Sequence, residues 1–337
     1  MTFFIYYSKI VGKVVITIGF LRFLEGIRLP FFDFIFSLIT HLGEETVFIA
    51  IALFIFWCVS KKNGYYILAV GFIGTMLNQI LKITFRIERP WVLDKDFTIV
   101  ESARAEATGY SFPSGHTQIA VGTFGAIAYT TKQKWLRILS IVLCVLIPFS
   151  RMYLGVHTPL DVGVSIVIAI ILIFAVRPII NKIEERPVIM FFFLGVFLVF
   201  AISFILFTEL YQFPDNINEE NLSSTIKNAY MIIGALFGIL ISYPIEKTHI
   251  NFETDGKWYI QIFKFVLGLL LLLGIKSGLK PLLNLIFKDI GIAHAIRYMI
   301  IVVFAVTVWP LTFKYFKRIE NYLEGKHEKP VKNTKRP

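Results

Sequence analysis

The sequence predicts an all-α protein, a polytopic transmembrane bundle of about ten crossings, and three observations lead to this fold class. The chain of 337 residues is 56% hydrophobic and only 17% charged, and its mean hydropathy of +0.70 lies outside the range of soluble globular domains. Its apolar residues gather in runs near the roughly 20 residues that a spanning helix needs. The basic residues lie at the ends of these runs, so the net charge of +11 indicates membrane topology and not nucleic-acid binding.

The elements follow from these runs in chain order. Residues 1–28 mix basic and apolar residues without a signal-peptide cleavage site, and we expect an amphipathic helix on the cytoplasmic surface, although Ile10 to Leu21 could itself cross. Residues 276–296 are too polar to span and predict a re-entrant or interfacial hairpin. The expected crossings fall at residues 29–43, 47–60, 64–84, 116–131, 135–150, 160–177, 188–208, 228–245, 258–276 and 297–313.

Orientation follows from the positive-inside rule, under which Lys and Arg accumulate in cytoplasmic loops. Basic pairs end the second crossing and separate the fourth from the fifth and the sixth from the seventh, whereas the connection at residues 209–228 is acidic. The basic tail at residues 314–337 is therefore expected in the cytoplasm, and its Lys- and Pro-rich composition predicts disorder. The basic pairs are Lys61 and Lys62, Lys132 and Lys134, and Lys182 and Arg186.

Ionisable residues near lipid are costly and commonly functional, and here they gather at three places. All three lie on the outer face of the predicted bundle. Because the orientation came from the cytoplasmic lysines and the clusters were located separately, this agreement supports a common site. The first place is the end of the third crossing, with Lys82, Arg89 and Pro90, and the second is the start of the fourth, with Pro113, Ser114, Gly115 and His116. The third is the connection from the fifth crossing to the sixth, with Ser150, Arg151, His157 and Asp161.

The cations suit a phosphate group. Lys82 and Arg89 are two helical turns apart and can project from one stripe of a helix, and Arg151 offers a planar fork that matches phosphate oxygens. Such fixed cations are what phosphoryl transfer mainly needs from a protein. For Lys82 and Arg89 alone, anchoring of the helix end by snorkelling is the alternative.

The second cluster reads as a turn followed by a helix start. Ser114 is the expected N-cap, and Gly115 permits close backbone approach. Backbone N–H groups at such a terminus bind phosphate oxygens, and His116 in the first turn could protonate a departing oxygen. A plain helix cap is the alternative.

The third cluster pairs a histidine with a carboxylate. His157 and Asp161 are spaced i to i+4, so the carboxylate can accept from one ring nitrogen and leave the other free for nucleophilic attack. A structural His–Asp hydrogen bond and half of a metal site are the alternatives. No third ligand is spaced to complete a metal site, and Cys58 and Cys144 lie within apolar runs, so no metal is expected.

Together these residues resemble the type-2 phosphatidic acid phosphatases, a family that shares a three-part signature with vanadium haloperoxidases and glucose-6-phosphatase. Lys82 to Pro90 (KITFRIERP) is similar to the first motif, Lys-x6-Arg-Pro. Pro113 to His116 (PSGH) is similar to the second. Ser150 to Asp161 (SRMYLGVHTPLD) is similar to the third, Ser-Arg-x5-His-x3-Asp.

The resemblance implies a role for each residue and a core of six crossings. His157 would be the nucleophile that forms phosphohistidine, Asp161 its orienting partner and His116 the acid that protonates the leaving oxygen. The resemblance implies no metal or other cofactor. Lys82, Arg89, Ser114, Gly115 and Arg151 would bind phosphate, with Pro90, Pro113 and Ser150 in support.

The chain is then expected to divide into an amphipathic segment (1–28), a catalytic core (29–183), a transmembrane extension (184–313) and the cytoplasmic tail (314–337). The motifs assign no role to the extension. The loop at residues 91–112 could cap the headgroup of a substrate, with Arg104 as the first residue to test.

The expected activity is hydrolysis of a lipid phosphate or diphosphate in a bacterial plasma membrane, with the active site outside the cytoplasm. Undecaprenyl diphosphate is the first substrate expected, and phosphatidate, phosphatidylglycerophosphate and sphingosine phosphate follow. The alternatives are a lipid phosphotransferase that uses the same phosphohistidine and a lipid transporter on an inactive phosphatase fold. The partners are the lipid substrate and the bilayer; nucleic acid is not expected, and assembly into a homo-oligomer stays open.

Overall fold

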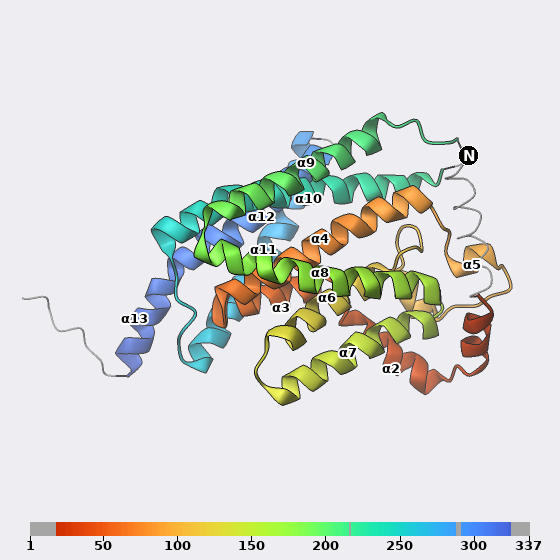
Figure 1. Cartoon of the computed structure of the whole chain (residues 1–337), viewed down its shortest axis with the longest axis horizontal. Coiled ribbons are helices and arrows are strands. Elements are labelled where there is room, and N and C mark those ends of the chain that lie inside the picture. The colour runs from red at the N-terminus through yellow and green to blue at the C-terminus, as the bar shows by residue number, and fades with distance from the viewer. Residues whose placement is uncertain (1–17, 216, 288–290, 325–337) are drawn as a thin grey trace, which may run out of the picture.

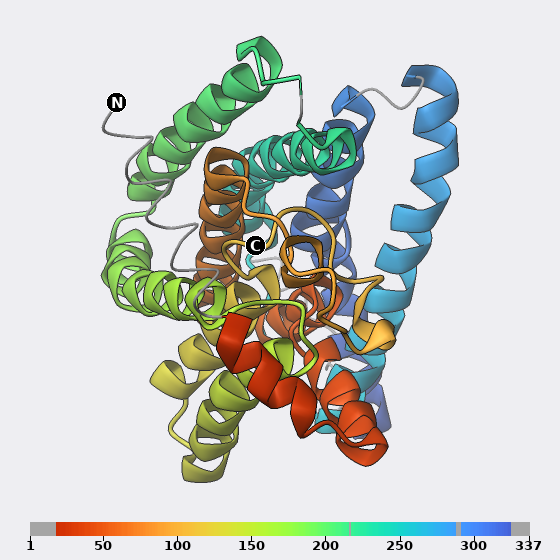
Figure 2. The same ribbon diagram turned by 90° about the vertical axis from the view of Figure 1, so that its right-hand side faces the viewer.

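The computed structural model describes residues 18–215, 217–287 and 291–324, and this part of the chain forms helices without any strand. Most of the long helices run roughly along one direction (Figure 1), whereas α11 crosses them steeply (Figure 2). The predicted all-α bundle is confirmed. We call the helices from α2 to α8 the core and those from α9 to α13 the extension.

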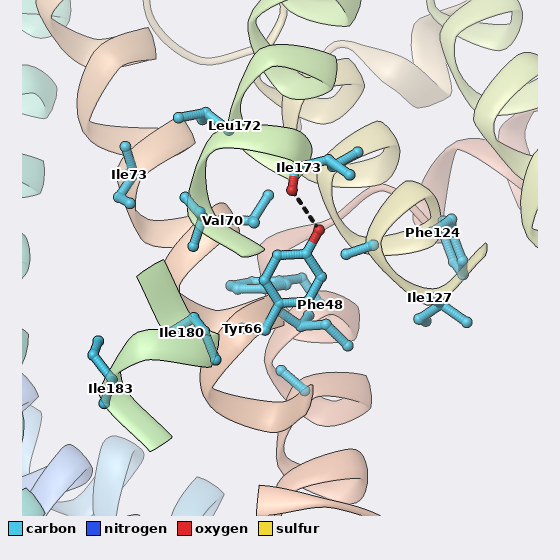
Figure 3. Packing of buried hydrophobic residues seen from close by; sticks show 14 of the residues in the cluster. Phe48, Tyr66, Val70, Ile73, Phe124, Ile127, Leu172, Ile173, Ile180 and Ile183 are labelled. Atoms are coloured by element: carbon cyan, nitrogen blue, oxygen red, sulfur yellow. Dashed lines mark hydrogen bonds between the residues drawn. The ribbon is translucent and has the colours of Figure 1, made fainter. Parts of the chain in front are cut away.

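The core is built around α6, which packs against α4, α7 and α8. Figure 3 shows the apolar cluster between these helices, where the Tyr66 hydroxyl donates to the carbonyl oxygen of Ile173 at 2.7 Å. A hydroxyl in so apolar a place needs such an acceptor. The core helices are α2 (Pro30–His41), α3 (Glu45–Cys58), α4 (Lys61–Phe85), α5 (Pro90–Leu93), α6 (Gly115–Thr130), α7 (Lys134–Tyr153) and α8 (Pro159–Glu185).

The extension packs against the core through α10, which contacts α4, α9 and α12. Small residues bring α10 and α12 together, as is common between membrane helices: a Cβ added at Gly234 would lie 2.0 Å from the carbonyl oxygen of Ala295. The extension helices are α9 (Val188–Leu210), α10 (Glu219–Ile245), η2 (Glu246–Ile250), α11 (Trp258–Phe287), α12 (Gly291–Val303), η3 (Phe304–Val308), η4 (Pro310–Thr312) and α13 (Phe313–Leu323).

Every predicted crossing coincides with a helix, but fewer than ten of these helices could cross the membrane singly. Seven spans in the described residues are long and apolar enough, and α2 with α3, bent by 49°, would make an eighth as one broken span. With 12 residues, α2 rises about 18 Å, well short of the roughly 30 Å of a hydrocarbon core. Apolar runs were therefore a better guide to helices than to crossings.

The described part of the N-terminal segment lies at the opposite end of the bundle from the one predicted. Residues 18–26 are helical, and the Arg22 guanidinium donates to Asp94 at 2.7 Å. Arg28 donates to the carbonyl oxygens of Thr98 at 2.7 Å and Tyr153 at 3.0 Å. These partners lie where α7 ends and beyond the end of α4, at the end that faces the viewer in Figure 2, far from Lys61.

The prediction that this segment lies at the same end of the bundle as Lys61 was therefore wrong for residues 18–28, while residues 1–17 lie outside the described residues. The physical reason is that Arg22 and Arg28 make specific bonds to protein groups. Charge counting assigned them to lipid headgroups.

Two further expectations were wrong. Residues 276–287 do not form a hairpin but continue α11, with Pro281 inside the helix, and α12 begins at Gly291. The first part of the tail is not disordered either, because α13 buries Phe316 and Glu320 against the extension. Residues 325–337 lie outside the described part of the chain.

Candidate active site

A cavity of about 350 Å³ opens at the end of the bundle where the three sequence clusters meet. It is bounded by α4, α6, the start of α3, the loop before α6 and the N-terminal part of α10. Five of the predicted residues line it: Lys82, Arg89, Gly115, His116 and His157. Residues distant in the sequence therefore meet at one place, as the spacing argument expected.

His157 lies in the turn between α7 and α8 and is 1% exposed. Its Nε2 accepts a hydrogen bond from Nη1 of Arg89 at 2.9 Å, because a guanidinium can only donate. Its Nδ1 lies 3.5 Å from Oδ2 of Asp161. This pattern assigns the proton to Nδ1 and the lone pair to Nε2.

The environment of His157 also favours its neutral form. Burial, followed by the nearby positive charges of Arg89, Arg151 and Lys82, holds the pKa of the His157 imidazole well below its ordinary value. A neutral imidazole keeps the lone pair that nucleophilic attack requires.

Asp161 is fixed by three groups that share one of its oxygens. Oδ2 accepts from Oγ of Ser111 at 2.7 Å and from the backbone N–H of Thr158 at 2.8 Å, in addition to facing His157. In turn the Thr158 hydroxyl accepts a hydrogen bond from the Asp161 N–H, which completes a capping box at the start of α8. The carboxylate is thus part of the helix start, and that start positions it beside the imidazole.

Arg89 and Lys82 hold the loop that precedes α6. Arg89 donates from Nε to the Gly109 carbonyl oxygen at 3.0 Å and from Nη2 to that of Thr108 at 2.6 Å. The Lys82 ammonium donates to the carbonyl oxygen of Tyr110. Both side chains are nearly fully buried, at 5% and 6% exposed. Two buried cations beside an imidazole make a strongly positive wall.

Arg151 lies behind the cavity, is fully buried and donates from Nη1 to Oγ1 of Thr40 at 2.8 Å. Its Nε and Nη2 atoms have no hydrogen-bond partner among the described residues. Buried guanidinium N–H groups that lack a partner are costly, and an anion in the site would satisfy them. Arg151 therefore fits the predicted phosphate-binding set without lining the cavity itself.

The start of α6 is built as the sequence predicted. Ser114 is the N-cap, and its hydroxyl accepts from the Thr117 N–H at 3.4 Å. A Cβ at Gly115 would meet no atom nearer than Oδ1 of Asn78 at 3.8 Å, so glycine leaves that wall of the cavity open. The buried Nε2 of His116 has no partner within the described chain and is free to exchange a proton with a ligand.

The other supporting residues lie away from the cavity. Pro90 begins α5, and the Ser150 hydroxyl donates to the Ile147 carbonyl oxygen within α7 at 2.7 Å. The carbonyl oxygen of Pro113 accepts from the Asn78 side chain at 3.3 Å. These three hold the backbone that carries the motifs.

Several lining residues were not anticipated as site residues. Glu106 and Thr108 line the cavity from the loop, whereas Arg104 is exposed and paired with Glu101 at 2.7 Å. Ser224 and Asn228 reach it from α10 of the extension. Their four-residue spacing on a polar helix end was the only sequence signal, and it is common at helix ends.

Among the described residues no group of three or more His, Cys, Asp or Glu side chains is arranged to hold a metal ion. Metal independence stays a prediction.

Fold and site together define a polytopic helical membrane protein whose bundle carries, at one end, a cavity lined by two histidines and two cations. Residues 62–185 match the PAP2 superfamily, and residues 230–321 match the transmembrane extension of PAP2 superfamily phosphatases. The chain belongs to the PAP2 superfamily and is an integral membrane protein.

Individual relatives are similar over part of the chain. An undecaprenyl-diphosphatase of Sulfolobus acidocaldarius is 35% identical over 36% of this chain and 57% of its own length. A probable sphingosine-1-phosphate phosphatase of Dictyostelium discoideum is 33% identical over 45% of this chain and 39% of its own length. Undecaprenyl-diphosphatase BcrC of Bacillus subtilis is 30% identical over 38% of this chain and 72% of its own length. The chain thus spans less than two thirds of the first two relatives.

A solved structure is also similar to part of the chain. The first transmembrane PAP2 type phosphatidylglycerolphosphate phosphatase from Bacillus subtilis is 26% identical, with a TM-score of 0.43, and the match covers 55% of this chain and 97% of that chain.

Proposed function

We propose that the protein is an integral membrane phosphatase that hydrolyses a lipid phosphate or diphosphate through a phosphohistidine formed on His157. The observation that carries this proposal is the unprotonated Nε2 of His157 beside a cavity that Lys82, Arg89 and His116 also line. The names of the relatives, all phosphatases or diphosphatases of lipids, support the same class of substrate.

In the proposed first step the phosphate enters among the cations, and the N–H of Arg89 that now bonds Nε2 of His157 turns to a phosphate oxygen. Nε2 attacks the phosphorus, and the bond from phosphorus to the lipid oxygen breaks. His116, protonated in the complex, gives its proton to that oxygen. Asp161 stabilises the charge that develops on the imidazole through Nδ1–H.

In the second step His116, now neutral, takes a proton from a water molecule as the water oxygen attacks the phosphorus. The P–N bond breaks, Nε2 regains its lone pair, and inorganic phosphate leaves. Lys82 and Arg89, which line the cavity, donate to the phosphoryl oxygens throughout, and the buried guanidinium of Arg151, which does not line it, adds positive charge. Preorganised donors of this kind lower the barrier without reorganisation during the reaction.

We propose that the active site faces away from the cytoplasm of a bacterial cell and that α13 ends on the cytoplasmic side. The basic residues at the other end of the bundle, Lys61, Lys62, Lys182 and Arg186, support this orientation through the positive-inside rule. A cysteine at exposed Lys95, beside the site, should react with a membrane-impermeant maleimide in intact cells. A cysteine at exposed Lys132 should not.

The direct test is purified full-length protein presented with lipid phosphates and diphosphates and scored by release of inorganic phosphate. Undecaprenyl diphosphate comes first because two of the relatives carry that activity in their names; phosphatidylglycerophosphate, sphingosine phosphate and phosphatidate follow. Rapid quenching at alkaline pH with a radiolabelled phosphate donor should trap label on His157. Turnover without label on His157, or no release from any member of the panel, would overturn the proposal.

A further inference from the structure

A second cavity, of about 140 Å³, lies between the core and the extension. Every side chain that lines it is apolar apart from the hydroxyls of Tyr65 and Tyr298. The core supplies one wall through α3, α4 and α8, and the extension supplies the other through α9, α10, α11, α12 and η3. The motifs at the active site leave this cavity unexplained.

The two cavities lie along the same pair of helices. On α4, Lys82 and Gln79 line the polar cavity, and Met76 lines the apolar one. On α10, Asn228 lines the polar cavity and Ile232, one turn further along the same face, lines the apolar one. The polar cavity is therefore continued, along the interface of α4 and α10, by an apolar one.

Met76 and Ile232 mark the junction. They belong to one apolar cluster and are 3% and 7% exposed. Met76 lies about 9 Å of helical rise below Lys82. A methionine is flexible enough to change rotamer when a neighbour arrives, so this contact can open without a change in the backbone.

The chemistry of a lipid phosphate requires such an arrangement. Its hydrocarbon begins within a few bonds of the phosphorus, so a phosphate held by Lys82 and Arg89 must direct its first carbons away from the cations. An apolar cavity of roughly 150 Å³ stays dry and holds a benzene-sized hydrocarbon. The cavity beside Met76 thus fits a short length of one chain and not a whole lipid.

We propose that this cavity binds the part of the substrate's hydrocarbon chain nearest the phosphate and that the extension, through α10 and α12, forms the far wall of the site. The proposal rests on the lipid phosphatase function proposed above. It gives the extension a direct part in substrate selection: the wall favours one unbranched or isoprenoid chain that enters between α4 and α10.

The first test fills the cavity. Ala235 lines it from α10 and is 6% exposed, whereas Ala175 of α8 is exposed on the outside of the bundle. Full-length Ala235→Phe should lose on the order of tenfold in kcat/KM with dodecyl phosphate and keep its kcat/KM with propyl phosphate. The matched control Ala175→Phe should leave both unchanged.

Two outcomes of this test would overturn the proposal. Equal losses on the long and short esters would mean that Ala235→Phe distorts the catalytic site in general. No loss on either ester would mean that the cavity takes no part in binding.

The second test needs no turnover, so it separates this proposal from the phosphatase function. A hexadecylphosphonate with a diazirine near its headgroup is photolysed on the wild-type protein, and adducts are mapped by mass spectrometry. We expect adducts around Met76 and Ile232 that inorganic phosphate competes away and that Ala235→Phe reduces.

Adducts confined to the outer apolar faces would refute the inference. A second probe is the corresponding diazirine alcohol, which lacks the phosphonate. If this alcohol also labelled residues near Met76, and phosphate did not reduce that labelling, the cavity would hold bulk lipid and the inference would be wrong. If the wild type released no phosphate from any substrate but the phosphonate still labelled the cavity, only the proposed reaction would fall.

Discussion

The core and the extension each contain a buried histidine that accepts a hydrogen bond from an arginine. In the core, Arg89 donates to Nε2 of His157 at 2.9 Å; in the extension, Arg297 donates to Nδ1 of His294 at 3.1 Å. The two histidines are similarly hidden, at 1% and 8% exposed. Nδ1 of His157 lies 3.5 Å from the Asp161 carboxylate, and His157 lines the polar cavity, which His294 does not line.

The comparison indicates what would set the proposed reactive histidine apart from a histidine that is only buried against an arginine. Such a contact satisfies polar groups within the bilayer, where an unpaired donor or acceptor is costly. Chemistry needs a lone pair directed at a space that a ligand can enter, together with a group that fixes the proton on the other nitrogen. His157 lines such a space, its Nε2 lone pair accepts from Arg89, and Asp161 faces its Nδ1.

Replacing each histidine by alanine tests the proposed difference between them most directly. His157→Ala should lower kcat on a lipid phosphate by about 10⁴-fold or more, because no other group replaces the nucleophile. His294→Ala should stay within about twofold of the wild type, since it lies outside the polar cavity. Phosphate release by monodisperse protein measures both, and comparable losses would show that the difference drawn here is wrong.

His116→Ala tests the division of labour inside the core. It should reduce turnover of alkyl phosphates by roughly 10² to 10⁴, the usual contribution of a positioned acid. With p-nitrophenyl phosphate the loss should be much smaller, because nitrophenolate departs without a proton. A uniform loss on both substrates would argue that His116 binds phosphate instead of protonating the leaving group.

Two buried lysines provide the next pair. The Lys82 ammonium donates to the Tyr110 carbonyl oxygen and lines the polar cavity, and Lys264 donates to the Trp57 carbonyl oxygen at 3.0 Å. Lys82→Met should cost about 10²-fold in kcat/KM through lost transition-state stabilisation. Lys264→Met should keep its activity, because replacing a buried charge by an apolar side chain of similar size is often tolerated.

Assays of both variants on one lipid phosphate, at a temperature where both stay folded, would measure the difference in kcat/KM. Should Lys264→Met lose as much activity as Lys82→Met, the extension would contribute charge to the reaction as well as shape.

The packing of the extension can be tested by small residues. A Cβ at Gly234 would lie 2.0 Å from the Ala295 carbonyl oxygen, whereas one at Gly195 would meet nothing within 4 Å. Gly234→Ala should lower stability by about 1 to 3 kcal/mol because α12 must move from α10. Gly195→Ala on α9 should be neutral or slightly stabilising. Unfolding midpoints in detergent would decide, and equal midpoints would contradict the close approach of α10 and α12.

The smallest expected effect is that of a chelator. If the cations Lys82, Arg89 and Arg151 take the place of a metal ion, incubation of the enzyme with EDTA should leave its turnover unchanged within error. Strong inhibition that added Mg²⁺ or Zn²⁺ reverses would require a different account of how phosphate charge is neutralised.

Much of the core could be predicted from sequence because a membrane penalises polar residues within apolar runs. Lys82, Arg89, His116 and His157 stand out for that reason, and each lies at an end of an expected crossing. The orientation from the basic loops then brought them to a common end. The structure places all four on one cavity.

The rest of the site could not be predicted from the sequence, because it depends on contacts between segments whose residues show no distinctive spacing. Ser111 bonds Asp161 from a loop, and Thr40 reaches Arg151 from α2. Neither residue has a pattern that separates it from other small polar residues. Met76 and Ile232 form the junction of two cavities only because α10 packs on α4, and any apolar pair would have looked the same in sequence.

Oδ2 of Asp161 accepts from the Thr158 N–H and also faces Nδ1 of His157. The start of α8 therefore fixes the orientation of the imidazole ring. Sliding α8 by a single residue would rotate the carboxylate by about 100° around the helix axis and away from the ring. The interval between His157 and Asp161 is therefore a mechanical constraint as well as a chemical one. Insertions at this junction should inactivate the protein, even where longer loops tolerate them.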